Sequence, residues 1–166
     1  MKLALTSLAI LLFALTASTA SAQSIQPDFT AVDMNGNNIE LSQLRGKVVV
    51  VNLWFIGCPN CMDEIKQLNQ LVGDYKGKSD VVFLGLAASP KPALEKFLAK
   101  NPFNYTIVPN AQMLILTKFG TPDKNGEINV PFPMHYVIDR EGKIVLKEQG
   151  VKGVDAVRNE LKKQVK

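Results

Sequence analysis

Two cysteines separated by two residues are the part of this sequence best suited to covalent chemistry. They lie in the stretch WFIGCPNCMDEI, residues 54–65, and are the only cysteines among 166 residues. Cys58 and Cys61 could form a structural disulfide, supply two ligands to a metal ion, or act as a redox pair. A structural disulfide is the weakest use of such close spacing, because the stability that a disulfide adds grows with the length of the loop that it closes.

A metal site would need further ligands from elsewhere in the chain. A structural zinc ion takes four ligands, and the sequence offers two cysteines and one histidine, His135. Copper is the remaining alternative, because thiolates and an imidazole suit it, with Cys58, Cys61 and His135 as ligands. A packed or half-exposed position on a strand is the simpler interpretation of His135. We therefore expect no metal, and no cofactor other than a redox-active disulfide.

The position of the two cysteines favours redox chemistry. KVVVVNLWF, residues 47–55, is a continuous β-branched run, typical of a strand buried on both faces. A helix is predicted to follow from about Pro59 to Gly73, with Pro59 suited to its first position. Unpaired N–H groups and the helix dipole at such a start favour a thiolate. Cys58 is therefore predicted to be an exposed nucleophile, and Cys61, one turn inside the helix, the shielded resolving thiol.

An acidic residue lies near the second cysteine on the predicted helix. At about 100° per residue, Glu64 falls on the apolar side with Cys61, whereas Asp63 points to the opposite side. One interpretation of Glu64 is a carboxylate at the helix start, where the dipole favours negative charge. The other is a partly buried carboxyl group that exchanges protons with Cys61.

The rest of the chain alternates between predicted strands and helices. A short hairpin is expected around the turn DMNGNN, residues 33–38. Further strands are predicted at 81–88, 105–108, 135–139 and 143–149, and helices at about 92–100, 111–119 and 154–165. Residues 121–130 are predicted to form a polar loop that either selects a partner or is a plain surface insertion. This order predicts an α/β fold of thioredoxin-like type, with a mixed central sheet flanked by helices and an N-terminal β-hairpin.

The first 22 residues differ in kind from the rest. One lysine precedes an apolar run of about 13 residues, which is short for a membrane span of about 20, and Ala20, Ser21 and Ala22 fit a cleavage pattern. We expect residues 1–22 to be a signal peptide cleaved after Ala22, and 23–166 to be a thioredoxin-like domain. The protein would then be exported to the periplasm, where disulfides persist. If the segment stayed uncleaved, it would tether the protein to the membrane.

The charge of the chain gives no sign of a nucleic-acid partner. The net charge is +4, but the basic residues are spread along the sequence and form no long run. We therefore expect protein partners and no nucleic acid.

Three segments together resemble a known family. NLWFIGCPNCMDEI, the preceding LSQLRGK and the later P-x-x-Y-V-I-D-x-x-G-K-I are similar to exported thioredoxin-fold thiol–disulfide oxidoreductases of the TlpA/ResA type. The resemblance implies that Cys58 attacks, Cys61 resolves and Glu64 is the acidic residue three positions later. It also implies a cis bond at Pro133, facing the cysteines and binding substrate together with Phe132. The implied function is a reductase of protein disulfides, which would need electrons from a membrane thiol donor. We expect the protein to be a monomer.

Three positions differ from the residues that related thioredoxin-fold proteins carry there. Gly57 stands where many relatives carry tryptophan before the first cysteine, and Lys66 stands where a proline often kinks the helix. Asn52 occupies the place of a buried aspartate in cytoplasmic thioredoxins. That replacement strengthens the interpretation of Glu64 as the carboxylate that handles the proton.

Overall fold

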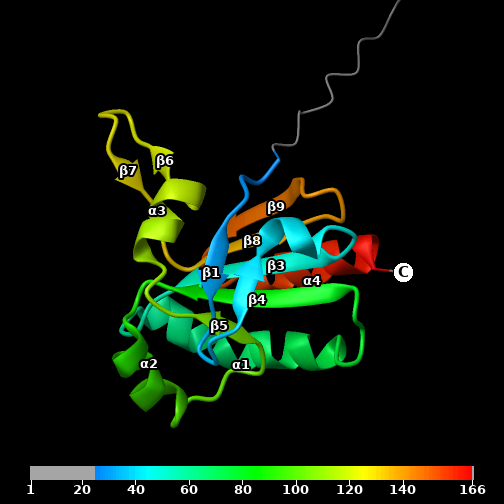
Figure 1. The fold of residues 1–166 in the computed structure, drawn as a ribbon, viewed down its shortest axis with the longest axis horizontal. Coiled ribbons are helices and arrows are strands. Elements are labelled where there is room, and N and C mark those ends of the chain that lie inside the picture. The colour runs from blue at the N-terminus through cyan, green and yellow to red at the C-terminus, as the bar shows by residue number, and fades with distance from the viewer. Residues whose placement is uncertain (1–24, 166) are drawn as a thin grey trace, which may run out of the picture.

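A mixed five-stranded sheet forms the centre of the molecule (Figure 1). The computed structural model describes residues 25–165, so the predicted signal peptide lies outside the described residues. Along the chain, its strands are β3 (Val48–Trp54), β4 (Val81–Ala87), β5 (Thr106–Val108), β8 (Met134–Ile138) and β9 (Ile144–Gln149). In the sheet they lie side by side in the order β5-β4-β3-β8-β9. Strand β3 is parallel to β4 and antiparallel to β8. The predicted mixed sheet is confirmed.

Both faces of β3 are covered, which explains its unbroken apolar sequence. Val49, Val51 and Leu53 point into one core cluster, and Val48 and Val50 into another. The first face is covered by α3 (Gln112–Phe119) and the N-terminal segment. The second is covered by α1 (Pro59–Asp74) and α4 (Gly153–Gln164). Because side chains alternate along a strand, Asn52 belongs to the second face, beneath α1 and α4.

The N-terminal hairpin is present where the sequence predicts it. Its strands are β1 (Thr30–Val32) and β2 (Asn38–Glu40), and a short 3₁₀ helix, η1 (Leu41–Leu44), leads from it towards β3. The carboxylate of Asp33 closes the turn by accepting hydrogen bonds from the backbone N–H groups of Asn35 and Asn37. Helix α2 (Lys91–Leu98) follows β4, with Pro92 in its first turn.

The expectation of a polar loop over residues 121–130 is wrong, because this segment folds into a second hairpin. Strands β6 (Thr121–Pro122) and β7 (Ile128–Asn129) pair only with each other, and in Figure 1 they project from the body beside α3. Asp123 accepts hydrogen bonds from the N–H groups of Asn125 and Glu127, as Asp33 does in the first hairpin. The turn sequence DKNG thus repeats the chemistry of DMNG.

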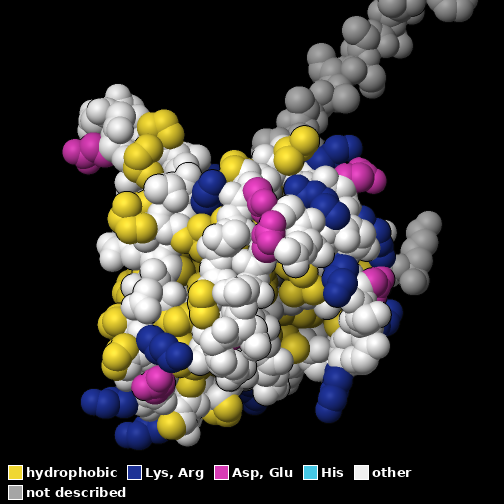
Figure 2. Space-filling model, in the orientation of Figure 1, with side chains coloured by type: hydrophobic (Ala, Val, Ile, Leu, Met, Phe, Trp, Pro, Cys, Tyr) yellow, Lys and Arg dark blue, Asp and Glu magenta, His cyan; other side chains and the backbone are white. Residues whose placement is uncertain are grey.

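The surface shows no single basic region on the face seen in Figure 2, where Lys and Arg side chains lie at several separate places. Within residues 25–165, no helix is both long and apolar enough to span a membrane.

Candidate active site

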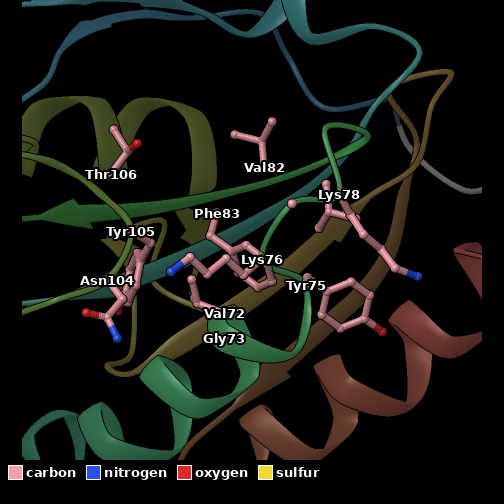
Figure 3. Close-up of a pocket in the computed structure, with 12 residues that line it drawn as sticks. Val72, Gly73, Tyr75, Lys76, Lys78, Val82, Phe83, Asn104, Tyr105 and Thr106 are labelled. Atoms are coloured by element: carbon pink, nitrogen blue, oxygen red, sulfur yellow. The ribbon is translucent and has the colours of Figure 1, made fainter.

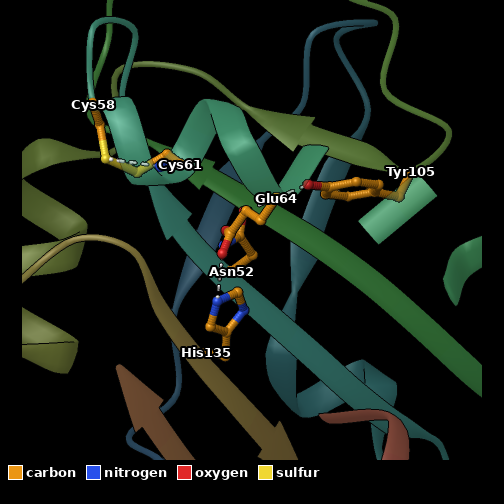
Figure 4. Close-up of polar contacts among 6 residues, drawn as sticks. All are labelled: Asn52, Cys58, Cys61, Glu64, Tyr105 and His135. Carbon is orange, nitrogen blue, oxygen red and sulfur yellow. Dashed lines mark hydrogen bonds and ion pairs between the residues drawn. A yellow bond between two sulfur atoms is a disulfide. The ribbon is translucent and has the colours of Figure 1, made fainter. Parts of the chain in front are cut away.

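The two cysteines form a disulfide at the start of α1, just after the connection from β3 (Figure 4). Cys58 is the N-cap of α1, Pro59 is the first helical residue, and the Cys58 sulfur accepts a hydrogen bond of 3.2 Å from the Cys61 backbone N–H. Gly57 has a φ of +90°, a conformation that side chains other than glycine rarely adopt. The absence of tryptophan at position 57 therefore fits the backbone that delivers Cys58 to the helix.

The expectation of an exposed Cys58 is wrong for this disulfide-bonded state. Cys58 is 4% exposed and Cys61 is 2% exposed, so the two differ little. Both belong to an apolar cluster with Trp54 and Ala87, and the Phe132 side chain packs against that cluster. Two of these neighbours, Ala87 and Phe132, are distant in sequence, so the residues around the cysteines do not by themselves predict this burial.

The peptide bond between Phe132 and Pro133 is cis, as the resemblance implies. Pro133 is buried, and its carbonyl oxygen accepts a hydrogen bond of 3.0 Å from the Gly150 N–H. The half-buried Phe132 ring meets the Phe55 ring edge-on, with 5.1 Å between centroids. The structure thus packs Phe132, the residue before the cis bond, against the apolar cluster that contains the cysteines.

Glu64 lies on the buried side of α1, and both of its carboxylate oxygens are engaged (Figure 4). Its side chain is 1% exposed, so it is fully rather than partly buried, and it lies beyond the first turn of α1, which does not fit a carboxylate at the helix start. The Asn52 amide donates a hydrogen bond of 3.0 Å to Oε1. His135 Nε2 lies 3.0 Å from Oε2. Glu64 is thus held from two sides, three residues after Cys61 on the same helix.

The partners of Glu64 come together through the pairing of β3 with β8. Asn52 lies directly opposite His135 in this antiparallel register, so both side chains project towards α1. His135 is 0% exposed, which confirms a packed position. Sequence reasoning missed the contact between His135 and Glu64. The available signal was a single polar residue in each of two otherwise apolar strands, VVVVNLW and MHYVI.

A tyrosine completes the polar network. The Tyr105 hydroxyl donates a hydrogen bond of 3.4 Å to Asn52 Oδ1. Burial raises the pKa of Tyr105 well above its usual value, and the negative charge of Glu64 raises it further, so the hydroxyl remains a donor. Gly85, the neighbour of Asn52 on β4, makes room for this reach, since a Cβ there would lie 2.9 Å from Tyr105 Cε2. Tyr105 therefore orients the Asn52 amide with its NH₂ group towards Glu64.

The copper alternative gains no support from these contacts. The Nε2 atom of His135 faces Glu64 rather than the cysteines. Among residues 25–165, no group of three or more His, Cys, Asp or Glu side chains is arranged to hold a metal ion.

A pocket of about 620 Å³ opens away from the cysteines, beside the end of α1 (Figure 3). Its lining includes Val72, Lys76, Lys78, Phe83 and Tyr105. Through Tyr105 the pocket borders the outer end of the polar network, but it contains neither cysteine.

Comparison with known proteins identifies a family and several similar sequences. The chain matches the AhpC/TSA family over residues 23–147. The thiol-disulfide oxidoreductase ResA of Bacillus thuringiensis subsp. konkukian (strain 97-27) is 26% identical over 137 residues, which cover 82% of this chain and 75% of the relative.

Two solved structures share the architecture. The thioredoxin domain of a thiol-disulfide oxidoreductase from Bacteroides vulgatus is 26% identical, with a TM-score of 0.70, and the match covers 87% of this chain and 97% of that one. A thioredoxin family thiol:disulfide interchange protein from Chlorobium tepidum TLS has a TM-score of 0.72 at 21% identity, with the same two coverages of 87% and 97%. The fold is therefore the thioredoxin fold.

Proposed function

Because the chain belongs to the AhpC/TSA family and is a thioredoxin-fold thiol–disulfide oxidoreductase of the TlpA/ResA type, we propose that it works as an exported reductase of protein disulfides. The observation that carries the proposal is the Cys58–Cys61 disulfide at the start of α1, packed beside the Phe132–Pro133 segment. This arrangement combines a sulfur pair that can exchange electrons with an adjacent stretch of backbone for a substrate.

The reaction moves two electrons from the cysteine pair to a substrate disulfide. In the reduced protein, the Cys58 thiolate attacks one substrate sulfur, the substrate S–S bond breaks, and a mixed disulfide forms as the other substrate thiolate leaves. Cys61 then loses its proton and attacks the Cys58 sulfur. The Cys58–Cys61 disulfide forms, and the second substrate thiolate is released and takes up a proton.

The start of α1 supports the thiolate form of Cys58. The Cys61 N–H already points at the Cys58 sulfur at 3.2 Å, and the first turn of α1 carries the positive end of the helix dipole. A thiolate at the N-cap accepts the same hydrogen bond and is stabilised by the dipole. Cys58 is therefore the nucleophile of the pair.

Glu64 is the proton acceptor for Cys61 in this proposal. Residues three apart on a helix are neighbours on one face, and both side chains are buried there. A buried thiol has little access to water, so a carboxylate on the same face provides a route for the proton. In the reverse reaction the same group returns it.

The substrate chain is placed against Phe132 and Pro133. Pro133 has no N–H, so it presents no donor that competes for the cysteine sulfurs. The half-exposed Phe132 ring, fixed edge-on by Phe55, offers an apolar contact beside the disulfide. These two residues would align the substrate so that its disulfide meets Cys58.

Turnover as a reductase needs a source of electrons. In the periplasm, to which the predicted signal peptide would send the protein, soluble thiols do not maintain a reduced cysteine pair. A membrane thiol protein that carries electrons across the bilayer is therefore the expected donor. We place the protein there as a monomer that acts on protein disulfides, with no nucleic acid as partner.

The reduction potential of the Cys58–Cys61 couple tests the direction of the reaction. A value near that of thioredoxin, about −270 mV, is expected for a reductase, and one near about −120 mV would instead indicate an oxidant. Reduction of insulin disulfides by the reduced protein, followed by its turbidity, tests the activity itself. Brief alkylation with peptide mapping should label Cys58 before Cys61, and faster labelling of Cys61 would reverse their roles.

A further inference from the structure

The single histidine of the chain sits in a closed site with one ring nitrogen engaged and the other unpartnered. His135 Nε2 lies 3.0 Å from Glu64 Oε2, whereas Nδ1 has no hydrogen-bond partner among the described residues. The ring packs against Gly153 at the start of α4, where an added Cβ would lie 2.0 Å from His135 Cδ2. The absence of a side chain at Gly153 therefore allows the imidazole to occupy this position.

The unpartnered nitrogen indicates where the imidazole proton resides. A buried N–H without an acceptor is rarer and costlier than a buried lone pair without a donor. The proton therefore belongs on Nε2, which donates it to Glu64, and Nδ1 carries none. A doubly protonated ring would leave a charged N–H at Nδ1 with no acceptor. His135 is thus a neutral donor, and the negative charge of the pair rests on Glu64.

The surroundings provide this charge with donors but no cation. The groups around the pair are the Asn52 amide on β3, the Tyr105 hydroxyl bonded to that amide, Cys61 three residues before Glu64 on the buried side of α1, Gly153 on α4, and Glu148, which lies opposite His135 on β9 with an exposed side chain. None of these described groups is positively charged. The Asn52 amide and His135 are therefore the two donors to the Glu64 carboxylate.

From this geometry we propose that His135 is a positioning residue for proton transfer at Cys61. It donates to Glu64 and fixes the direction of the carboxylate on the buried side of α1. The proposal rests on the proposed role of Glu64. In the step itself, the S–H bond of Cys61 breaks, an O–H bond forms on Glu64, and the electron pair left on sulfur attacks Cys58. His135 keeps its own proton throughout.

Removal of this donor should affect the rate and the pH profile of one step. Without the Nε2–H bond, Oε2 of Glu64 loses its donor and the direction of the carboxylate is no longer fixed. His135→Leu should therefore slow resolution of the mixed disulfide about tenfold and shift the midpoint of its pH–rate profile. His135→Gln retains an N–H donor and should recover most of the rate.

Two controls separate positioning from packing. Val137 lies two residues along the same face of β8 and is 0% exposed, so Val137→Ala should lower stability and leave the pH midpoint unchanged. In a Glu64→Gln background, His135→Leu should cause no further shift. An unchanged midpoint in folded His135→Leu, or the same shift without Glu64, would overturn the proposal. Absence of disulfide exchange in the wild type would instead contradict the proposed function.

A measurement on the unaltered protein tests the tautomer directly. Because the chain has one histidine, its imidazole ¹⁵N signals in tag-free protein are unambiguous. A protonated Nε2 and a bare Nδ1 at neutral pH are expected. A proton on Nδ1, alone or together with Nε2, contradicts the proposal even if every substitution at position 135 prevents folding.

Discussion

Two pairs of side chains meet on the first turns of α1, and the chain assembles them in different ways. Cys58 and Cys61 are three residues apart, and the start of one helix is enough to bring their sulfurs together. Glu64 and His135 are 71 residues apart and meet only because β8 pairs with β3 beneath α1. The local pair should therefore keep its geometry through changes in the core, while the distant pair should be sensitive to packing.

The largest effect is expected from the local pair. Cys58→Ser should lower disulfide reduction about a thousandfold or more, because the attacking thiolate at the helix start is lost. Cys61→Ser should still attack but stop at the mixed disulfide, which mass spectrometry would detect as a covalent adduct with the substrate. An adduct on Cys58→Ser rather than on Cys61→Ser would exchange the two roles.

A smaller loss of rate is expected at Glu64. Glu64→Gln keeps the shape of the side chain and removes the proton acceptor, so resolution of the mixed disulfide should slow about a hundredfold. Asp63→Asn is the matched control, because Asp63 is exposed on the other side of the same helix turn and should leave the rate within about twofold. Stopped-flow measurement of both variants across pH would check this. Equal profiles for wild type and Glu64→Gln would leave Glu64 with a structural role only.

The packing of the distant pair is tested at Gly153. Gly153→Ala should lower the free energy of unfolding by about 1–3 kcal/mol, since the added methyl group overlaps the His135 ring. Gly73→Ala in α1 is the control, as a Cβ there meets nothing within 4 Å, and it should be neutral or slightly stabilising. Denaturant unfolding would compare the two. If Gly153→Ala proved as stable as wild type, the imidazole would not fill this space.

The smallest effect is expected at Tyr105, the outer end of the network. Tyr105→Phe removes the donor to Asn52 and should cost about 1 kcal/mol at neutral pH. Because burial, aided by the charge of Glu64, raises the pKa of Tyr105 in the folded state, its contribution is present below the usual tyrosine value near 10. It is lost as the pH rises beyond that value.

Alkaline unfolding would measure this difference. The wild type should lose stability more steeply than Tyr105→Phe above about pH 10. Parallel curves for the two proteins would show that Tyr105 ionises freely in the folded state. The other raised tyrosines, Tyr75 and Tyr136, are common to both proteins and cancel in the comparison.

Sequence predicted the parts of the molecule that depend on neighbours along the chain. Local backbone preferences were enough to predict three of them: the strand within residues 47–55, the helix start at Pro59 and the turn at Asp33. Each appears where expected. The second hairpin carried the same turn signal at Asp123, and its two-residue strands were too short to show a β pattern.

Other features could not be predicted, because they depend on strand register and on packing between distant segments. Nothing in a single sequence states that Asn52 lies opposite His135, and a shift by one residue would turn both side chains away from α1. The apolar cluster that contains Cys58 likewise includes a contact with Phe132, from a segment more than 70 residues later. The missed residues were therefore the polar ones whose partners are remote.

The β6–β7 hairpin should tolerate inserted residues. Its strands pair only with each other, every residue from Thr121 to Asn129 is exposed, and the buried core resumes at Val130. No strand of the central sheet takes its register from this segment. Its tip, around Lys124 and Asn125, is therefore a natural place to insert a peptide tag or fluorophore, which would report on bound protein without altering the sheet that carries the cysteines.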